Sequence, residues 1–162
     1  MLDNGADFFI GTQITLLENQ YNFVLPFFID AFQHFLYLNP DHSRDERRAH
    51  WLSLRDRFGG IADYSGYEEA LAFVWHRQLH LFEVPFYYIE YGIAKLGALQ
   101  VWRNAQSDPQ KAVKMYRKAL ALGGSRPLPE LFETAGANFD FSYNTLAPLM
   151  ELLQQELEKL PD

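Results

Sequence analysis

The chain has 162 residues, 22% of them charged and 48% hydrophobic, so it can bury the core of one domain and is too apolar to be disordered. Its formal net charge of −7 has the wrong sign for a protein that binds nucleic acid or an anionic membrane surface. It contains no cysteine, which excludes disulfide bonds, Cys-ligated zinc and a thiol nucleophile. Aromatic residues make up 16%, a high share that core packing, an interface or a binding site must explain.

The first residues, Met1 to Gly5, include no basic residue and no small-residue cleavage site, so we do not expect a secretory signal. No stretch of about 18 uncharged apolar residues follows, so we expect no membrane span either. These observations predict a cytoplasmic protein.

Helix signals then follow one another along the chain. The first predicted helix runs from about Phe8 to Leu38, with Pro26 as an internal kink or break. The second begins at a capping box, in which Ser43 and Glu46 satisfy each other's backbone N–H groups. It ends at Gly59-Gly60, where a left-handed residue can close the helix.

The middle of the chain predicts two more helices. Ser65 is expected to cap a helix that runs towards Leu81, and Pro85 is expected to open the next one, because its missing N–H costs nothing in a first turn. From Phe86 to Arg103 the pattern is apolar almost all round, which is typical of a central, buried helix. Small residues along it would let neighbouring backbones come close, at Gly92, Ala94, Gly97 and Ala98.

Three helices complete the prediction. Asp108-Pro109 is expected to supply the N-cap and the first residue of a helix that ends at Gly123-Gly124. A short helix is expected from Pro127 to Gly136, and Thr145 is expected to cap the last one, which leaves Pro148 in its first turn. No segment alternates long enough to form a strand. The sequence therefore predicts an all-α fold, a multi-helix array.

Two histidines have the spacing of paired metal ligands on a helix. His76 and His80 are four residues apart in a segment predicted to be helical, so they can share one face as paired zinc ligands do. Arg77 stands where the HExxH motif places its general base, and its charge would repel a divalent cation. Packed or surface histidines are therefore favoured over a stand-alone metal site. Glu46 and His50 have the same spacing among arginines, where a solvated charged face is favoured.

Asp30 and His34 form a further pair at this spacing, inside an aromatic run. Polar groups in such surroundings need hydrogen-bond partners. A satisfied buried pair is the favoured interpretation, and a polar network behind a functional site is the alternative.

The segment from His80 to Gly92 is the richest in candidate functional groups. It places His80 shortly before Tyr87, Tyr88 and Tyr91. Neutral N–H and O–H donors of this kind are suited to stabilising an oxyanion at a peptide carbonyl. Tyr87 and Tyr91 share a helix face and Tyr88 lies close to it, so two or three could line one groove. Aromatic core packing with hydroxyl groups that reach the backbone is the alternative.

These residues lie within a longer pattern that resembles the C-terminal part of the oligoendopeptidase F-type metallopeptidases, zinc gluzincins related to thimet oligopeptidase. The resemblance is carried by residues 30–34 (DAFQH), 56–59 (DRFG), 76–80 (HRQLH), 82–94 (FEVPFYYIEYGIA), 96–100 (LGALQ) and 121–132 (ALGGSRPLPELF). It is clearest from about residue 25 to residue 160, within a single helical domain expected over 1–162.

The resemblance implies the helical C-terminal portion of an oligopeptidase fold, with zinc as the cofactor of the complete enzyme and oligopeptides as its substrates. In that family an HExxH helix supplies two zinc ligands and the general base, and a Glu on the following helix supplies the third ligand. This chain has no HExxH, so we expect no zinc on it and no peptidase activity by the chain alone. The resemblance also implies a role in substrate binding or oxyanion stabilisation for His80, with the tyrosine-bearing helix beside it. The candidate catalytic residues are thus His80, Tyr87, Tyr88 and Tyr91, and the residues expected behind them are Asp30, His34 and His76.

A second class of function stays open, a non-catalytic helical module that binds a partner or itself. A portion of a larger helical enzyme would expose apolar surface that the rest of the enzyme covers. The expected partners are then a second copy of the chain or the N-terminal part of such an enzyme, and neither nucleic acid nor a membrane is expected.

Overall fold

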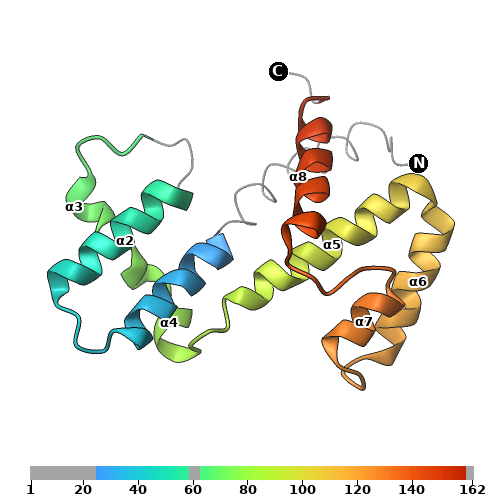
Figure 1. Ribbon diagram of the computed structural model, residues 1–162, viewed down its shortest axis with the longest axis horizontal. Helices are drawn as coiled ribbons and strands as arrows, with labels where there is room; N and C mark the ends of the chain where they lie inside the picture. The colour runs from blue at the N-terminus through green and yellow to red at the C-terminus, as the bar shows by residue number, and fades with distance from the viewer. Residues whose placement is uncertain (1–24, 59–62, 160–162) are drawn as a thin grey trace, which may run out of the picture. The chain divides into compact units, whose positions relative to one another are not determined.

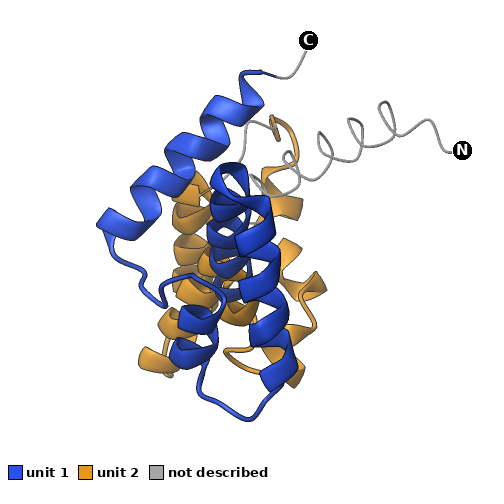
Figure 2. Cartoon of the chain, turned by 90° about the vertical axis from the view of Figure 1, so that its right-hand side faces the viewer, with its two compact units in different colours: residues 1–20, 93–162 blue, residues 21–92 orange. Residues whose placement is uncertain are grey.

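The structure is a computed structural model that describes residues 25–58 and 63–159. Every regular element in these residues is a helix (Figure 1), which confirms the predicted all-α fold. The chain divides into two compact units (Figure 2): unit 2 includes residues 25–92, and the described part of unit 1 is 93–159. The expectation of a single domain over 1–162 stays a prediction.

The helices of unit 2 are mostly short. They are the helix of residues 25–38, α2 (Arg44–Phe58), α3 (Glu68–Leu71), the 3-10 helix η1 (Val74–Arg77) and α4 (His80–Glu83). Helix α5 (Ile89–Ser107), the longest that lies wholly within the described residues, begins in unit 2 and continues in unit 1. Unit 1 also holds α6 (Pro109–Leu122), α7 (Leu128–Thr134) and α8 (Tyr143–Leu157). None of the helices in the described ranges is long and apolar enough to cross a membrane.

Aromatic rings make up much of the core of unit 2, together with Ile29, Leu54 and Leu81. Trp51 of α2 packs against Phe28 and Phe32 of the helix of residues 25–38, with ring centroids 4.4 and 5.0 Å apart. Phe32 also contacts Trp75 of η1 at 5.5 Å. The Trp51 indole N–H donates to the Leu71 carbonyl at 3.0 Å, so this buried ring has its polar atom satisfied. Part of the high aromatic content is therefore accounted for by this core.

Unit 1 has its own buried set. It comprises Leu96, Leu99 and Gln100 of α5, Ala112 of α6, Ala137, and Leu149 and Leu153 of α8. The Gln100 side chain donates to the Asn138 carbonyl at 2.9 Å and accepts from its N–H at 2.8 Å. Both polar ends of this buried amide are thus paired, and they fix the segment that leads from α7 to α8.

Small residues on α5 do admit close neighbours, but these neighbours are aromatic rings. A Cβ at Gly92 would lie 3.1 Å from the Phe27 ring, and one at Gly97 would lie 3.0 Å from the Phe132 ring. The helix is also not buried all round, because Tyr91 and Ala98 are among its exposed residues. The prediction of a fully buried central helix is therefore wrong.

Helix ends that depend on adjacent residues are confirmed. Ser43 Oγ accepts from the Glu46 N–H at 3.2 Å, and a Glu46 carboxylate oxygen accepts from the Ser43 N–H at 2.8 Å. Asp108 accepts from the Lys111 N–H at 3.0 Å, with a proline at the first position of α6. That helix ends before Gly123, which has a φ of 53°. The predicted short helix before Gly136 is α7, whereas residues 8–24 and Gly59-Gly60 lie outside the described residues.

The helix predicted from Ser65 towards Leu81 is wrong, because the segment folds as α3, η1 and the start of α4. Ser65 does not cap it, since its N–H and hydroxyl both donate to the Asp63 carboxylate. Trp75 and Leu81 are buried in the core of unit 2. Packing of these side chains overrides the local helical preference.

Pro85 does not open a helix, because α5 begins only at Ile89. Pro85 and Phe86 instead occupy the centre of a turn, in which the Tyr87 N–H donates to the Val84 carbonyl at 3.1 Å. Phe86 has a φ of 62°. Proline at the second position and a positive φ at the third are the features of a type II turn.

The last helix also begins differently from the prediction. Tyr143 is the first residue of α8, and Ser142 occupies the N-cap position, so Thr145 does not cap it and Pro148 lies inside it. Asp140 organises this end: its carboxylate accepts from the Ser142 N–H at 3.0 Å and from the Thr145 hydroxyl. These hydrogen bonds, with that of the Ser142 hydroxyl, lower the Asp140 pKa.

Candidate functional site

His80 and the three candidate tyrosines come together in unit 2. The His80 ring lies 5.8 Å from Tyr87 and nearly parallel to it, and it meets Tyr88 edge-on at 5.1 Å. Tyr91 is edge-on to His80 at 5.9 Å and also contacts the Tyr87 ring at 5.7 Å. We call these four residues the His80–tyrosine cluster. It is assembled from the start of α4, the turn that follows it and the start of α5.

The hydroxyl groups of the cluster have different surroundings. Tyr88 is partly buried, and its hydroxyl donates to Gln78 Oε1 at 3.0 Å, which directs this proton into the protein. The Tyr91 hydroxyl lies 3.4 Å from His80 Nε2. Tyr87 and Tyr91 are each 42% exposed. His80 with Tyr87 and Tyr91 thus forms the part of the cluster that a ligand can reach.

Such a pairing can present a neutral hydrogen-bond donor to a carbonyl oxygen. When His80 Nε2 carries no proton, the Tyr91 hydroxyl can donate to it; when Nε2 is protonated, the imidazole donates instead. In the second case the Tyr91 oxygen accepts from the imidazole, and the Tyr91 hydroxyl proton can rotate towards another acceptor. Neutral donors held in advance are the kind of group that stabilises charge developing on an oxygen.

Asp30 and His34 do pair, but not as the buried pair that was favoured, because the His34 side chain is 56% exposed. His34 Nδ1 lies 3.2 Å from an Asp30 carboxylate oxygen and 3.0 Å from the Asp30 carbonyl oxygen. Burial raises the Asp30 pKa, which the nearby imidazole partly opposes. The His34 ring, itself exposed, meets the Phe86 ring edge-on at 5.0 Å. Through this ring contact the pair touches the turn that carries Tyr87.

His76 lies apart from these contacts. It is exposed on η1, with its ring 3.9 Å from Trp75 and 5.8 Å from Phe73. Gln78, with φ −88° and ψ 85°, interrupts the helical conformation between η1 and α4. His76 and His80 are thus not on one continuous helix, and the shared face on which a paired metal site depends is absent from this segment.

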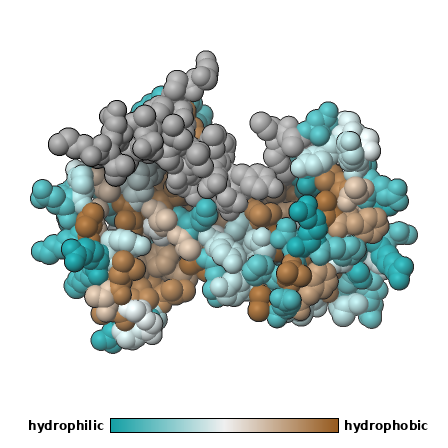
Figure 3. Space-filling model, turned by 180° about the vertical axis from the view of Figure 1, so that it is seen from behind, coloured by the Kyte–Doolittle hydropathy of each residue, from teal (hydrophilic) through white to brown (hydrophobic). Residues whose placement is uncertain are grey.

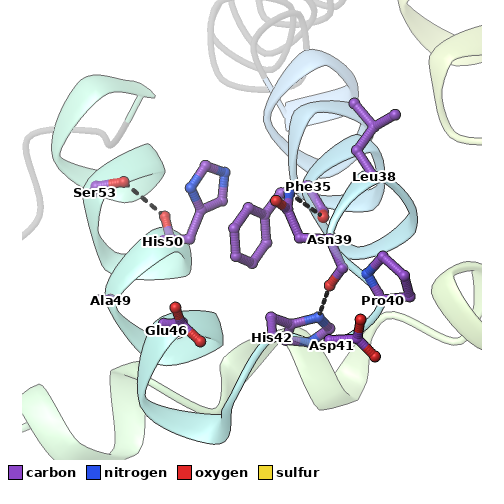
Figure 4. A pocket seen from close by; sticks show the side chains of 10 residues that line it. All are labelled: Phe35, Leu38, Asn39, Pro40, Asp41, His42, Glu46, Ala49, His50 and Ser53. Carbon is purple, nitrogen blue, oxygen red and sulfur yellow. Dashed lines mark hydrogen bonds between the residues drawn. The ribbon is translucent and has the colours of Figure 1, made fainter.

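A second set of polar residues lines a hollow of about 740 Å³ between the helix of residues 25–38 and α2 (Figure 4). The His50 ring stacks on Phe35 at 3.9 Å, and burial lowers its pKa. The exposed Glu46 carboxylate is engaged by Ser43, which lowers its pKa. Glu46 and His50 are thus each paired with another group, as capping and stacking residues.

Four residues that shape the site were not among the candidates predicted from the sequence. Gln78 holds the Tyr88 hydroxyl, and Gln33 accepts from the Phe86 N–H at 3.1 Å across 53 residues of sequence. Pro85 fits the first turn of a helix as well as a type II turn, so its signal was ambiguous. Neither glutamine had a local signal, because each acts on a distant part of the chain.

Comparison with known proteins gives the family. The sequence of residues 12–150 matches peptidase family M3. The chain belongs to this family. A crystal structure described as an oligoendopeptidase F matches with a TM-score of 0.80 and 30% sequence identity, over 98% of this chain and 28% of that chain. A second, an oligoendopeptidase F from Bacillus anthracis, matches with a TM-score of 0.72 and 24% identity, over 93% of this chain and 24% of that chain.

The resemblance to oligoendopeptidase F-type enzymes is thereby confirmed, and the chain spans about a quarter of the length of the two solved structures. No curated protein matches the chain in sequence. It is a partial homologue of the M3 peptidases.

Family M3 consists of zinc peptidases, so the fit of a zinc ion to this chain can be tested. A protein zinc site needs three or four nitrogen, sulfur or carboxylate ligands. Within residues 25–58 and 63–159, no three His, Cys, Asp or Glu side chains gather in this way, and the sequence contains no HExxH. The residues described do not fit a zinc ion.

Proposed function

We propose that the chain is the C-terminal portion of an M3 oligoendopeptidase and supplies one wall of the cleft that binds short peptides. The observation that carries this proposal is the contact of the Tyr91 hydroxyl with His80 Nε2 in a cluster whose outer tyrosines are 42% exposed. Family membership supports it, since a peptidase must hold the peptide carbonyl on which it acts.

In this proposal His80 and Tyr91 act as donors to a substrate carbonyl oxygen. A tyrosine hydroxyl and a neutral imidazole N–H both donate without bringing a charge to the peptide, and donors held in place in this way stabilise charge that develops on an oxygen. The Tyr87 ring, stacked on His80, provides a flat apolar surface for the peptide beside the donors. Tyr88 supports the cluster from behind through its bond to Gln78.

The zinc ion of the complete enzyme would be held by another segment, so the chain alone should not hydrolyse peptides. We expect no turnover of a fluorogenic oligopeptide by the purified chain with added zinc. Turnover that is lost in His80→Ala would contradict this part of the proposal.

Peptide binding is the direct test. An ¹⁵N-labelled sample is titrated with a blocked alanine-rich hexapeptide, and we expect shifts of the amide signals of the His80–tyrosine cluster. His80→Ala should abolish them, whereas Tyr143→Phe, which alters an exposed tyrosine of unit 1, should leave them unchanged. Absence of shifts in the unaltered chain at millimolar peptide would refute the proposed function.

A second candidate function is docking of a protein partner, and exposed apolar residues near the cluster favour it. Leu79, Phe82 and Val84 are all exposed. Figure 3 shows one face of the chain, on which apolar residues lie among hydrophilic ones. The expected occupants are the metal-bearing part of the enzyme or a second copy of the chain. Light scattering after size-exclusion chromatography, with an apolar dye, tests this: a monomer that binds no dye would exclude it.

A further inference from the structure

The turn from Val84 to Tyr87 joins the helix that carries His80 to the tyrosines. At its centre, Phe86 has a φ of 62° and is the one non-glycine residue with positive φ in the described part of the chain. A side chain with a Cβ is unfavourable in this region, and a bulky aromatic one is rarely found there. Such a conformation persists only where surrounding contacts hold it.

The helix of residues 25–38 provides these contacts from one face. Gln33 Oε1 accepts from the Phe86 N–H at 3.1 Å. The Phe86 ring lies between His34 and Tyr37, at 5.0 Å from each ring. Residues 33, 34 and 37 fall within one turn and a fraction of the helix, so they approach the Phe86 turn together.

The side chain of Gln33 makes one hydrogen bond among the described residues, the one that its Oε1 accepts from the Phe86 N–H. It is 1% exposed, and its Nε2 has no hydrogen-bond partner among the residues that the structure describes. An unpaired buried amide group is unfavourable, and an apolar side chain of the same shape would avoid it. The other fully buried glutamine, Gln100, has both its polar atoms paired with Asn138. The contribution of Gln33 therefore rests on its oxygen and the Phe86 N–H.

We propose that Gln33 is a positioning residue for the peptide-binding cluster. By holding the Phe86 N–H it keeps the turn in its left-handed conformation, and this conformation places the Tyr87 ring against His80. Without the bond, Phe86 relaxes to a negative φ and Tyr87 is carried away from the imidazole. The role of Gln33 in binding rests on the proposed function; its role in the geometry of the cluster does not.

Two NMR measurements on the full chain test the proposal without peptidase activity. The first is hydrogen exchange of the Phe86 amide, and the second is the set of NOEs between the His80 and Tyr87 rings. In Gln33→Met, which preserves the size of the side chain and removes the acceptor, we expect the Phe86 amide to exchange about tenfold faster and the NOEs to disappear. The Trp51 indole N–H, bonded to Leu71 in the core of the same unit, should keep its protection.

Two further variants separate positioning from general stability. Gln33→Glu keeps an acceptor oxygen at the same place; with its carboxyl in the neutral form that burial favours, it should retain the slow Phe86 exchange and the NOEs. Gln100→Met removes an equally buried amide in unit 1 and should leave both unchanged. An effect of Gln100→Met equal to that of Gln33→Met would overturn the proposal, as would Gln33→Met with unchanged exchange and NOEs.

The unaltered chain gives a decisive result even when Gln33→Met does not fold. A Phe86 amide that exchanges as fast as an exposed amide would show that the bond is not held in solution, and the proposal would be wrong. Peptide titration separates the two proposals. If the unaltered chain shows peptide shifts but Gln33→Met leaves the Phe86 exchange and the His80–Tyr87 NOEs unchanged, only the positioning proposal is refuted. If Gln33→Met changes the exchange and the NOEs but the unaltered chain shows no peptide shifts, only the proposed function is refuted.

Discussion

Tyr88 and Tyr91 make a matched pair for substitution by phenylalanine, because each loses only a hydroxyl. The two losses should affect different properties of the chain. Tyr88→Phe removes the donor to Gln78 Oε1, a bond of 3.0 Å at a partly buried site. Tyr91→Phe removes a hydroxyl that is 3.4 Å from His80 Nε2 on a 42% exposed side chain. We expect the first substitution to lower stability and the second to lower peptide affinity.

The magnitudes follow from these contacts. Loss of a partly buried hydrogen bond that leaves its acceptor without a donor costs about 1 kcal/mol. For a chain of this length, that lowers the melting temperature by about 2–4 °C. The long, exposed contact of Tyr91 should contribute less than about 0.5 kcal/mol to stability. If its hydroxyl donates to a bound carbonyl, its removal should weaken peptide binding by about three- to tenfold.

Thermal unfolding and the ¹⁵N peptide titration, run on both variants and the unaltered chain, measure these two quantities. A Tyr88→Phe variant that unfolds at the same temperature as the unaltered chain would show that the Gln78 bond contributes nothing. The assignment of roles within the cluster would be refuted if Tyr88→Phe lost peptide affinity while Tyr91→Phe kept it.

Three further predictions concern local structure. Ser43→Ala removes a capping hydroxyl and should lower the free energy of unfolding by about 1 kcal/mol, measured by urea denaturation. Because the Asp140 pKa is lowered in the folded chain, its carboxylate stabilises the fold at pH values above the ordinary pKa of 3.8. This stabilisation is lost as the pH falls through the lower pKa of the folded state. The stability difference between Asp140→Asn and the unaltered chain, measured by urea denaturation, should therefore shrink in acid. Gly97→Val should cost about 1–3 kcal/mol, because its Cβ would lie 3.0 Å from the Phe132 ring; Ala98→Val, on the exposed side of the same helix, is the control and should cost less.

Helix ends were predictable where the chemistry is local. Ser43 and Glu46 are three residues apart, and the bonds between them form whatever the rest of the chain does. The same holds for Asp108, whose carboxylate accepts from the N–H of Lys111, three residues further along the chain. At α8 the local rule named the wrong residue, because Asp140 lies close enough to capture the hydroxyl of Thr145.

The turn at Pro85 could not be derived from its neighbours. A proline fits the first turn of a helix as well as it fits a type II turn. The structure favours the turn because Gln33, which is 53 residues away, binds the Phe86 N–H. Likewise Trp75 is drawn into contact with Phe32, and this packing breaks the predicted helix of that region.

The candidate tyrosines were visible in the sequence, but the difference between them was not. All three stand within five positions and share the same chemistry. Their roles diverge through partners on other elements: Gln78 takes the Tyr88 hydroxyl, and His80 lies beside that of Tyr91. Sequence spacing indicates which residues can meet along one helix. It does not indicate which residues a turn between two helices places next to each other.

The break in the helix is what assembles the cluster. On one continuous helix, residues 80 and 87 would be about 10 Å apart along the axis and residues 80 and 91 about 16 Å apart, too far for ring contact. Across the turn, the ring centroids of His80 and Tyr87 are 5.8 Å apart and those of His80 and Tyr91 are 5.9 Å apart. A break between α4 and α5 is therefore a condition for surrounding one imidazole with three tyrosines, and Phe86, with its φ of 62°, lies within that break.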